Sequence, residues 1–237
     1  MAQLHIKSGT TWAETYARCR MESPESFDAE SLRNLIGGDW VPAAVSGVHS
    51  SPIDGTLIVG PPRIDHQTAV DAVALAAEQH TSWMGTPLAE RVARVTHAVD
   101  LLESQRDLLA MLLVWEIGKP WQIALADVDR CIDGVRWYVE QIPRQLKMGT
   151  SEERTPLSGP VSNIASWNYP MSVQVHAELV QILAGNAVIA KTPSQGGFHT
   201  LTLAHAMMHR AGLPVTLVSG VGSELGDALI QSPQIGA

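Results

Sequence analysis

From Gly159 onwards, short apolar segments alternate with amphipathic ones, and this alternation restricts the fold more than any other feature of the chain. The short apolar segments are predicted as strands at residues 161–165, 187–190 and 215–219. The segments between them are predicted as helices at about residues 171–184 and 199–211, and a last helix begins near Ser223. Strands joined through helices by tight connections make right-handed crossovers and a parallel sheet. The predicted fold class is therefore α/β.

The predicted sheet is small. After Gln231, Ser232 and Pro233 too few residues remain for a fourth parallel strand. We therefore expect an incomplete Rossmann-like parallel sheet with flanking helices and with one apolar edge left open.

The N-terminal half of the chain is predicted to contain a hairpin and a group of helices. Gly37-Gly38 lies between two short apolar pairs, which indicates a tight hairpin, and Asp54-Gly55 marks a second turn. Helices are predicted at about residues 67–80, 88–104, 106–117 and 120–142, with Pro143 ending the last one.

The domain organisation follows from changes in this pattern. Residues 1–34 show little periodicity and are predicted as an N-terminal arm, and residues 35–237 as one partial domain. Within it, residues 144–158 are polar and rich in turn formers, which indicates a connector or an oligomerisation arm.

Composition excludes several classes of partner. The chain has 16 basic and 24 acidic residues, and its net charge of -8 opposes binding to nucleic acid or to an anionic membrane surface. No apolar run is long enough for a signal peptide or a membrane span, so we expect a cytoplasmic location.

The two cysteines, Cys19 and Cys131, predict neither a disulfide nor a zinc site, because they are far apart and in no Cys-x-x-Cys pair. Cys131 lies on the apolar face of a predicted helix and is interpreted as a core thiol. His205 and His209 are four residues apart, but no third ligand is evident, so no metal site is predicted.

Polar residues and glycines gather where the predicted strands end. In an open parallel sheet the ligand binds outside the carboxyl ends of the strands. The residues expected at this edge are Trp167, Asn168, Lys191, Ser194, Gly220 and Gly222.

Each of these positions also has a simpler interpretation. Lys191 is either a donor to ribose hydroxyls or a phosphate, or a solvated lysine at a strand end. Asn168 is either an amide donor to a developing oxyanion or part of an Asx turn. The glycines from Gly220 to Gly226 have one residue too many for the usual dinucleotide fingerprint and also fit a plain tight turn.

Several segments from Leu35 onwards resemble the aldehyde dehydrogenase superfamily. They are Leu35-Ile36-Gly37-Gly38-Asp39-Trp40, Glu116-Ile117-Gly118-Lys119-Pro120, Ser166-Trp167-Asn168-Tyr169-Pro170, the run from Leu183 to Lys191, and Ala211-Gly212-Leu213-Pro214. The resemblance implies that residues 35–237 are the N-terminal part of the cofactor-binding domain.

The resemblance also implies a role for each candidate residue. Asn168 would stabilise the oxyanion formed when a cysteine thiolate attacks an aldehyde. Ser166 and Trp167 would line the cofactor. Lys191 would bond the adenosine ribose, and the turn at Gly220 and Gly222 would lie against the adenine.

The implied cofactor is NAD or NADP. Ser194 stands where NAD-preferring members of the family often carry a glutamate that bonds the ribose hydroxyl. Serine removes a carboxylate that would repel a 2′-phosphate. The sequence therefore favours tolerance of NADP.

In the intact family the implied reaction is oxidation of an aldehyde to a carboxylic acid. The family's catalytic cysteine and general-base glutamate lie beyond the position of Ala237, so we expect the chain alone to be inactive. Two alternatives remain open: a noncatalytic nucleotide-binding subunit, and a piece that pairs with a complementary chain carrying the cysteine. A homo-oligomer is also compatible with the sequence.

Overall fold

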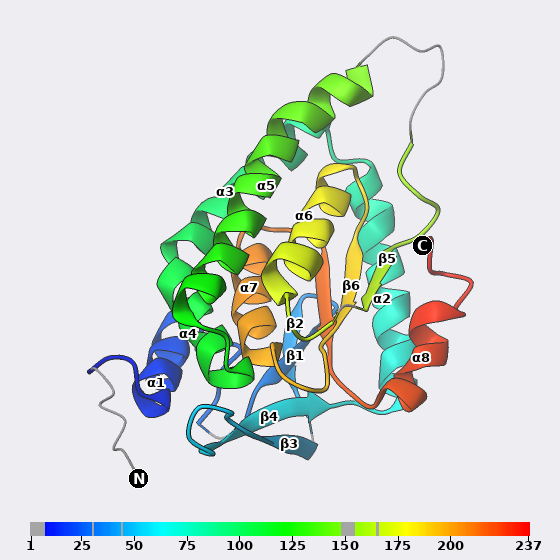
Figure 1. Cartoon of the computed structure of the whole chain (residues 1–237). Coiled ribbons are helices and arrows are strands. Elements are labelled where there is room, and N and C mark those ends of the chain that lie inside the picture. The colour runs from blue at the N-terminus through cyan, green and yellow to red at the C-terminus, as the bar shows by residue number, and fades with distance from the viewer. Residues whose placement is uncertain (1–7, 30, 44, 148–154, 165) are drawn as a thin grey trace.

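The structure is a computed structural model that describes residues 8–29, 31–43, 45–147, 155–164 and 166–237. Its helices are α1 (Trp12–Glu22), α2 (His66–Met84), α3 (Leu88–Ser104), α4 (Arg106–Ile117), α5 (Trp121–Lys147), a π-helical turn η1 (Pro170–Val175), α6 (His176–Leu183), α7 (Phe198–Arg210) and α8 (Gly222–Ile230). Its strands are β1 (Arg33–Ile36), β2 (Asp39–Pro42), β3 (Val45–Ser50), β4 (Leu57–Arg63), β5 (Val161–Ile164), β6 (Val188–Lys191) and β7 (Val215–Val218) (Figure 1).

The main sheet has five strands in the order β2-β1-β7-β6-β5. The parallel pairing of β5 with β6 and of β6 with β7 confirms the predicted sheet. The prediction that one side of this sheet stays open is wrong at β7, because β1 pairs with β7 in the antiparallel direction at Leu35 and Leu217. At the other edge, the amide of Ser162 donates to the carbonyl of Ala237.

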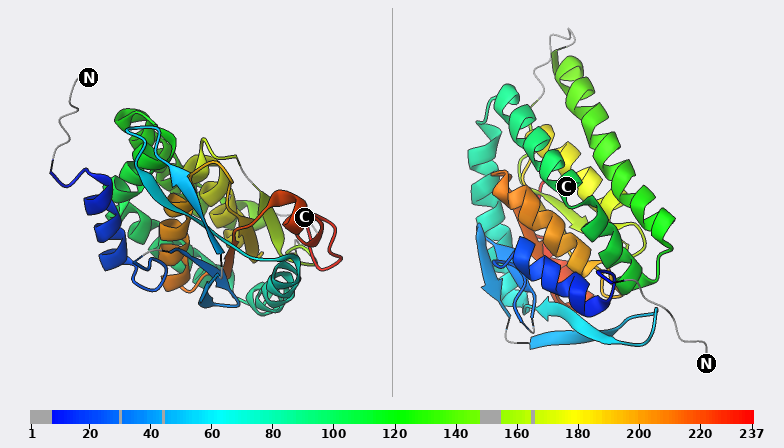
Figure 2. Two further views of the ribbon diagram at one scale, coloured as in Figure 1. Left: turned by 90° about the horizontal axis from the view of Figure 1, so that it is seen from below. Right: turned by 90° about the vertical axis from the view of Figure 1, so that its left-hand side faces the viewer.

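Both faces of the sheet are buried. Along β6, Val188 and Ala190 belong to one apolar cluster and Ile189 to another. Alternate residues of a strand point to opposite faces, so the sheet lies between two helical layers. Helices α2 and α8 cover one face, and α6 and α7, backed by α3, α4 and α5, cover the other (Figures 1 and 2).

The described part of the predicted N-terminal arm contains a regular helix, α1. Helix α1 begins with a capping box in which Thr11 and Glu14 bond each other's backbone amide. Tyr16 and Cys19 are buried against the core, and α1 contacts α4 (Figure 2). This packing joins residues far apart in the chain, so the weak local periodicity of residues 1–34 did not predict it. The boundary at residue 34 stays a prediction.

Helix α5 does not end at Pro143, contrary to the prediction, but continues to Lys147. Proline removes one backbone donor and does not forbid helical geometry before it when packing holds the helix. Tyr138, Val139 and Ile142 supply that packing against the core. Of the predicted connector at residues 144–158, residues 148–154 lie outside the described residues.

Strands β3 and β4 form a separate two-stranded sheet, with the predicted turn at Asp54-Gly55 between them. This hairpin lies across the carboxyl ends of β6 and β7 (Figures 1 and 2). The amide of Ile64, just after β4, donates to the carbonyl of Ser219, just after β7. The hairpin is thus fixed to the edge where ligands bind in parallel sheets.

Glycines allow β3 and β4 to approach closely at an irregular point in their pairing, between Ser46 and Val48. A Cβ atom at Gly60 would lie only 2.3 Å from the carbonyl carbon of Gly47.

Within the described residues, no helix is long and apolar enough to cross a membrane.

We expect Gly60→Ala to lower the free energy of unfolding by about 1–3 kcal/mol, because the added methyl group forces the two strands apart. Gly226→Ala is the control: a Cβ there meets no atom within 4 Å, and alanine within α8 should stabilise the chain. Denaturant titration followed by circular dichroism measures both changes. An unchanged midpoint for Gly60→Ala contradicts the close approach.

Candidate functional site

A hollow of about 250 Å³ lies at the carboxyl ends of β6 and β7, between them and the β3–β4 hairpin. It is lined from the sheet side by residues after β6 and β7, and from the hairpin side by residues of β3 and β4. The lining residues are Gly47, Val48, His49, Pro61, Arg63, Thr192, Pro193, Ser194, Gly220, Val221 and Gly222. Three residues predicted to bind a cofactor, Ser194, Gly220 and Gly222, therefore share one hollow.

Lys191 ends β6 directly before the lining residue Thr192 and is only 6% exposed. Its ammonium donates to the carbonyl of Thr192 at 3.0 Å and has no acidic partner among the described residues. Burial lowers the pKa of Lys191 below its usual range. A buried cation without a counter-charge favours an anion nearby.

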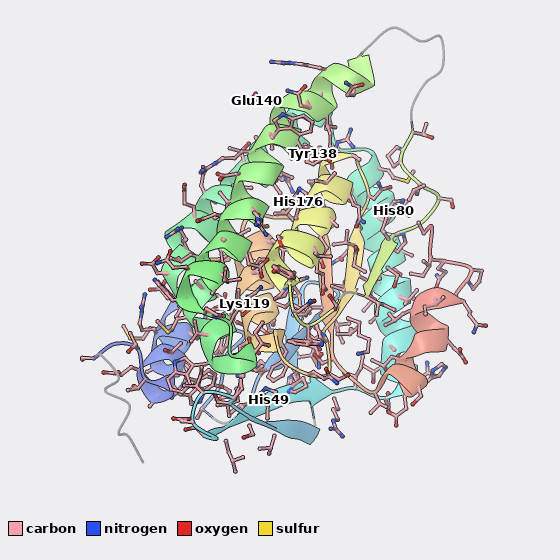
Figure 3. The ribbon with its side chains drawn as sticks, viewed as in Figure 1. His49, His80, Lys119, Tyr138, Glu140 and His176 are labelled. Carbon is pink, nitrogen blue, oxygen red and sulfur yellow. The ribbon has the colours of Figure 1, made fainter. Side chains whose placement is uncertain are left out.

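A second, smaller hollow of about 210 Å³ lies next to the first. Trp167 and Gln195 line it, and His49 lines both hollows. The ring of His49 donates through Nε2 to the carbonyl of Glu116 at 2.8 Å, so β3 is joined here to the end of α4 (Figure 3). His49 thus lies between Trp167, which is predicted to line a cofactor, and the glycines after β7.

Asn168 lies in an exposed turn between β5 and η1. The hydroxyl of Ser166 donates to Oδ1 of Asn168 at 2.7 Å. The carboxamide oxygen is therefore occupied, while no described residue bonds its Nδ2. The free end of the side chain is a donor, as an oxyanion requires.

The turn is held from inside by Lys119. Its ammonium donates to Asp127 at 2.8 Å and to the carbonyl of Asn168 at 2.6 Å, and it lies 3.8 Å from the ring centre of Tyr169 (Figure 3). Asp127 also accepts the amide of Ser172 at 2.9 Å. Lys119 and Asp127 are 8% and 0% exposed, so this ion pair fixes the backbone around Asn168 in a water-poor place.

A second buried carboxylate organises the loop after β6. Glu116 accepts the backbone amides of His199 and Thr200, as well as the His199 ring and the Thr200 hydroxyl. These residues form the first turn of α7, where unpaired amides favour a negative charge. Glu116 therefore fixes the point at which the loop with Ser194 and Gln195 enters α7.

Neither cysteine belongs to the site. Cys19 and Cys131 are completely buried in the apolar core. Burial raises the pKa of both thiols, and nearby carboxylates add to the effect. A thiol without access to its thiolate form is a poor nucleophile. No three His, Cys, Asp or Glu side chains gather as metal ligands among the described residues.

The structure brings the predicted residues to one edge of the sheet in two groups. Lys191, Ser194, Gly220 and Gly222 lie at or next to the larger hollow. Ser166, Trp167 and Asn168 lie on the turn beside the smaller hollow, and of these Trp167 lines it. Their functional roles stay predictions.

Sequence reasoning missed Arg63 and His49, which reach this edge from the small hairpin. It also missed the positioning contacts of Lys119 and Glu116. The motif around Gly118 was the only local signal for Lys119 and Glu116. It did not predict their contacts, because the sequence does not show whether a charged side chain is buried or exposed.

Comparison with known proteins adds a family to this geometry. The model of the aldehyde dehydrogenase family matches residues 40–237. The NADP-dependent glyceraldehyde-3-phosphate dehydrogenase of Pisum sativum is 32% identical over 233 residues, which are 89% of this chain and 46% of that protein. An aldehyde dehydrogenase of Deinococcus radiodurans is 32% identical and matches 85% of this chain and 41% of its own length. The chain thus spans less than half the length of these relatives.

Two solved structures show the same arrangement. The NADP-dependent glyceraldehyde-3-phosphate dehydrogenase from Bacillus halodurans C-125, complexed with NADP, is 29% identical with a TM-score of 0.75, over 86% of this chain and 46% of that one. A 1-pyrroline-5-carboxylate dehydrogenase from Thermus with bound NAD has a TM-score of 0.80 over 99% of this chain and 48% of that one. At 24% identity, the second shows the fold alone.

We expect Lys119→Met to lower the free energy of unfolding by about 3–5 kcal/mol, because it leaves the Asp127 carboxylate buried without a partner. Arg136→Met is the control, since Arg136 is 42% exposed and its ion pair with Glu103 should contribute about 1 kcal/mol or less. Adding Asp127→Asn to Lys119→Met should recover part of the loss by removing the unpaired charge. Equal effects of the two single variants in denaturant titrations would refute this role of the pair.

Both cysteines should resist alkylation by iodoacetamide in the folded chain at about pH 8, where an ordinary exposed thiol is partly ionised. Their raised pKa values keep both thiols protonated, and their burial keeps the reagent away from the sulfur atoms. Mass spectrometry should find two modified cysteines only after unfolding in denaturant. Rapid labelling of Cys131 in the native state would contradict its assignment to the core.

Proposed function

The chain belongs to the aldehyde dehydrogenase family, and from this we propose that it forms the nucleotide-binding part of an enzyme that oxidises an aldehyde to a carboxylic acid with NAD or NADP. The observation that carries the proposal is the shared edge of the sheet. The hollow with Ser194 and the glycines lies there, and so does the turn that presents the free amide of Asn168.

The residues at the larger hollow fit one end of a dinucleotide. Its volume of about 250 Å³ is below the roughly 300–1,000 Å³ of pockets that enclose a whole ligand, so it suits a ribose with its phosphate. Lys191, Ser194 and the glycines after β7 would hold the adenosine end. Trp167, beside the smaller hollow, would line the continuation of the cofactor. When bound, NAD or NADP supplies the hydride acceptor.

Asn168 would donate through Nδ2 to the oxygen of the aldehyde as negative charge develops on it. Lys119 would keep that donor in place through the backbone carbonyl of Asn168, which avoids a reorganisation cost during the reaction. Ser166, whose hydroxyl donates to Oδ1 of Asn168, would orient that side-chain amide in addition to lining the cofactor.

The nucleophilic thiolate would come from a polypeptide segment outside these 237 residues. Cys19 and Cys131 are unsuited to that role, because both are buried with raised pKa values. We therefore propose that the chain alone does not oxidise aldehydes and that a complementary segment, in the same or another chain, completes the site. The unpaired cysteines fit the expected cytoplasmic location.

Two relatives with NADP in their names support acceptance of NADP by this chain, as does the absence of an acidic side chain from the described lining of the larger hollow. A calorimetric titration should therefore find binding of NADP at least as tight as binding of NAD. Absence of binding by both dinucleotides would overturn the proposed function.

We expect Ser194→Glu to weaken NADP binding by about tenfold or more, equivalent to ~1.4 kcal/mol, with little loss of NAD binding. The new carboxylate would face the 2′-phosphate, and like charges repel. Ser104→Glu adds the same charge on the exposed surface of α3 and is the control. Equal weakening of NAD and NADP binding by Ser194→Glu would argue against a ribose at this position.

A further inference from the structure

Arg63 is a cation at the larger hollow for which the described residues provide no partner. It is the last residue of β4, its side chain is exposed, and it lines the hollow with Ser194 and Gly222. Among the described residues its guanidinium makes no ion pair and no side-chain hydrogen bond. Arg106 and Arg136, by contrast, each face a carboxylate.

The position of Arg63 is well determined by its backbone. The next residue, Ile64, donates its amide to the carbonyl of Ser219, and Arg63 itself pairs with Val45 of β3. These contacts hold the end of β4 beside the end of β7. The side chain therefore starts from a fixed point at the rim of the hollow.

Gly47 leaves room for the guanidinium at that rim. A Cβ atom built on Gly47 would lie 3.6 Å from Nη2 and 3.8 Å from Nε of Arg63. The guanidinium thus lies along the backbone of β3, at a residue that also lines the hollow. A larger side chain at Gly47 would compete with it for this space.

The charged side chains described at and next to the hollow are all positive. No aspartate or glutamate is among its described lining residues. Arg63 lies on the hairpin side, and the buried ammonium of Lys191 lies behind Thr192 on the sheet side. Two cations without carboxylates favour a ligand group with more negative charge than a ribose hydroxyl.

A phosphate on the ribose meets this requirement. Guanidinium offers several N–H donors in a planar fork that matches phosphate oxygens, and an arginine near the ribose is a known means of accepting a 2′-phosphate in dinucleotide folds. We infer that Arg63 binds the 2′-phosphate of NADP and makes NADP the preferred dinucleotide of this chain. The inference rests on the proposed function, since it requires the adenosine ribose to lie at Ser194.

The test uses two small probes that differ only in this phosphate. Calorimetric titration of the full chain with 2′,5′-ADP and with 5′-AMP compares their dissociation constants without any need for catalysis or for the rest of the site. We expect 2′,5′-ADP to bind about tenfold or more tightly than 5′-AMP, with an advantage that falls as salt rises.

Three variants assign that advantage to one residue. Arg63→Gln should remove most of it by weakening 2′,5′-ADP and leaving 5′-AMP nearly unchanged. Arg63→Lys should keep part of it, because lysine retains the charge but not the fork. Arg130→Gln removes an exposed arginine of α5 that is absent from the lining, and should change neither constant.

The outcomes separate this inference from the proposed function. If 5′-AMP binds and 2′,5′-ADP binds no more tightly, nucleotide binding survives and the role of Arg63 is refuted. An advantage that persists in Arg63→Gln also refutes it and assigns the phosphate to other residues. If neither probe nor either dinucleotide binds, the proposed function fails and the inference fails with it.

Discussion

The parallel pairing of β5, β6 and β7 is the constraint on which the rest of the structure depends. Parallel strands require crossovers, and here the crossover helices α6 and α7 bury one face of the sheet, while α2 and α8 bury the other. Apolar residues therefore fill the strands, and polar residues gather after their carboxyl ends. The hollow between the sheet and the β3–β4 hairpin lies where this arrangement leaves polar backbone and side chains accessible.

The site is positioned by buried charges rather than by the sheet alone. Lys119 and Asp127 hold the turn that carries Asn168, and Glu116 holds the start of α7. A buried ion pair contributes little net stability compared with apolar packing, because both charges lose hydration. What these groups provide here is geometry, since Lys119 bonds the backbone of Asn168 and Glu116 bonds the backbone at the end of the loop that carries Ser194. Their partners come from distant parts of the chain, so α4, α5 and the loop between them position proposed site residues in its last third.

Local signals predicted much of this fold. The predicted helices 171–184 and 199–211 end where expected because Gly185 and Gly212, just after them, adopt positive φ angles that end a helix, and Gly118 does the same after α4. The alternation of short apolar segments with helical ones from Gly159 onwards predicted the parallel sheet, which the pairing of β5, β6 and β7 confirms. Long-range packing was not predicted: Tyr16 and Cys19 anchor α1 to the core, and Ile142 keeps α5 helical past Pro143. Such contacts depend on residues that the local pattern does not include.

The sequence by itself determined the order of strands and helices from Gly159 onwards and the residues that follow each strand. These properties depend on near neighbours, through periodicity, glycine conformation and the direction of parallel strands. Only the tertiary structure decided that β1 closes the sheet beside β7, that Lys119 supports Asn168, and that Arg63 faces Ser194 across a hollow. Each of these pairs joins segments far apart in the chain, and their meeting depends on how whole elements pack to bury apolar surface.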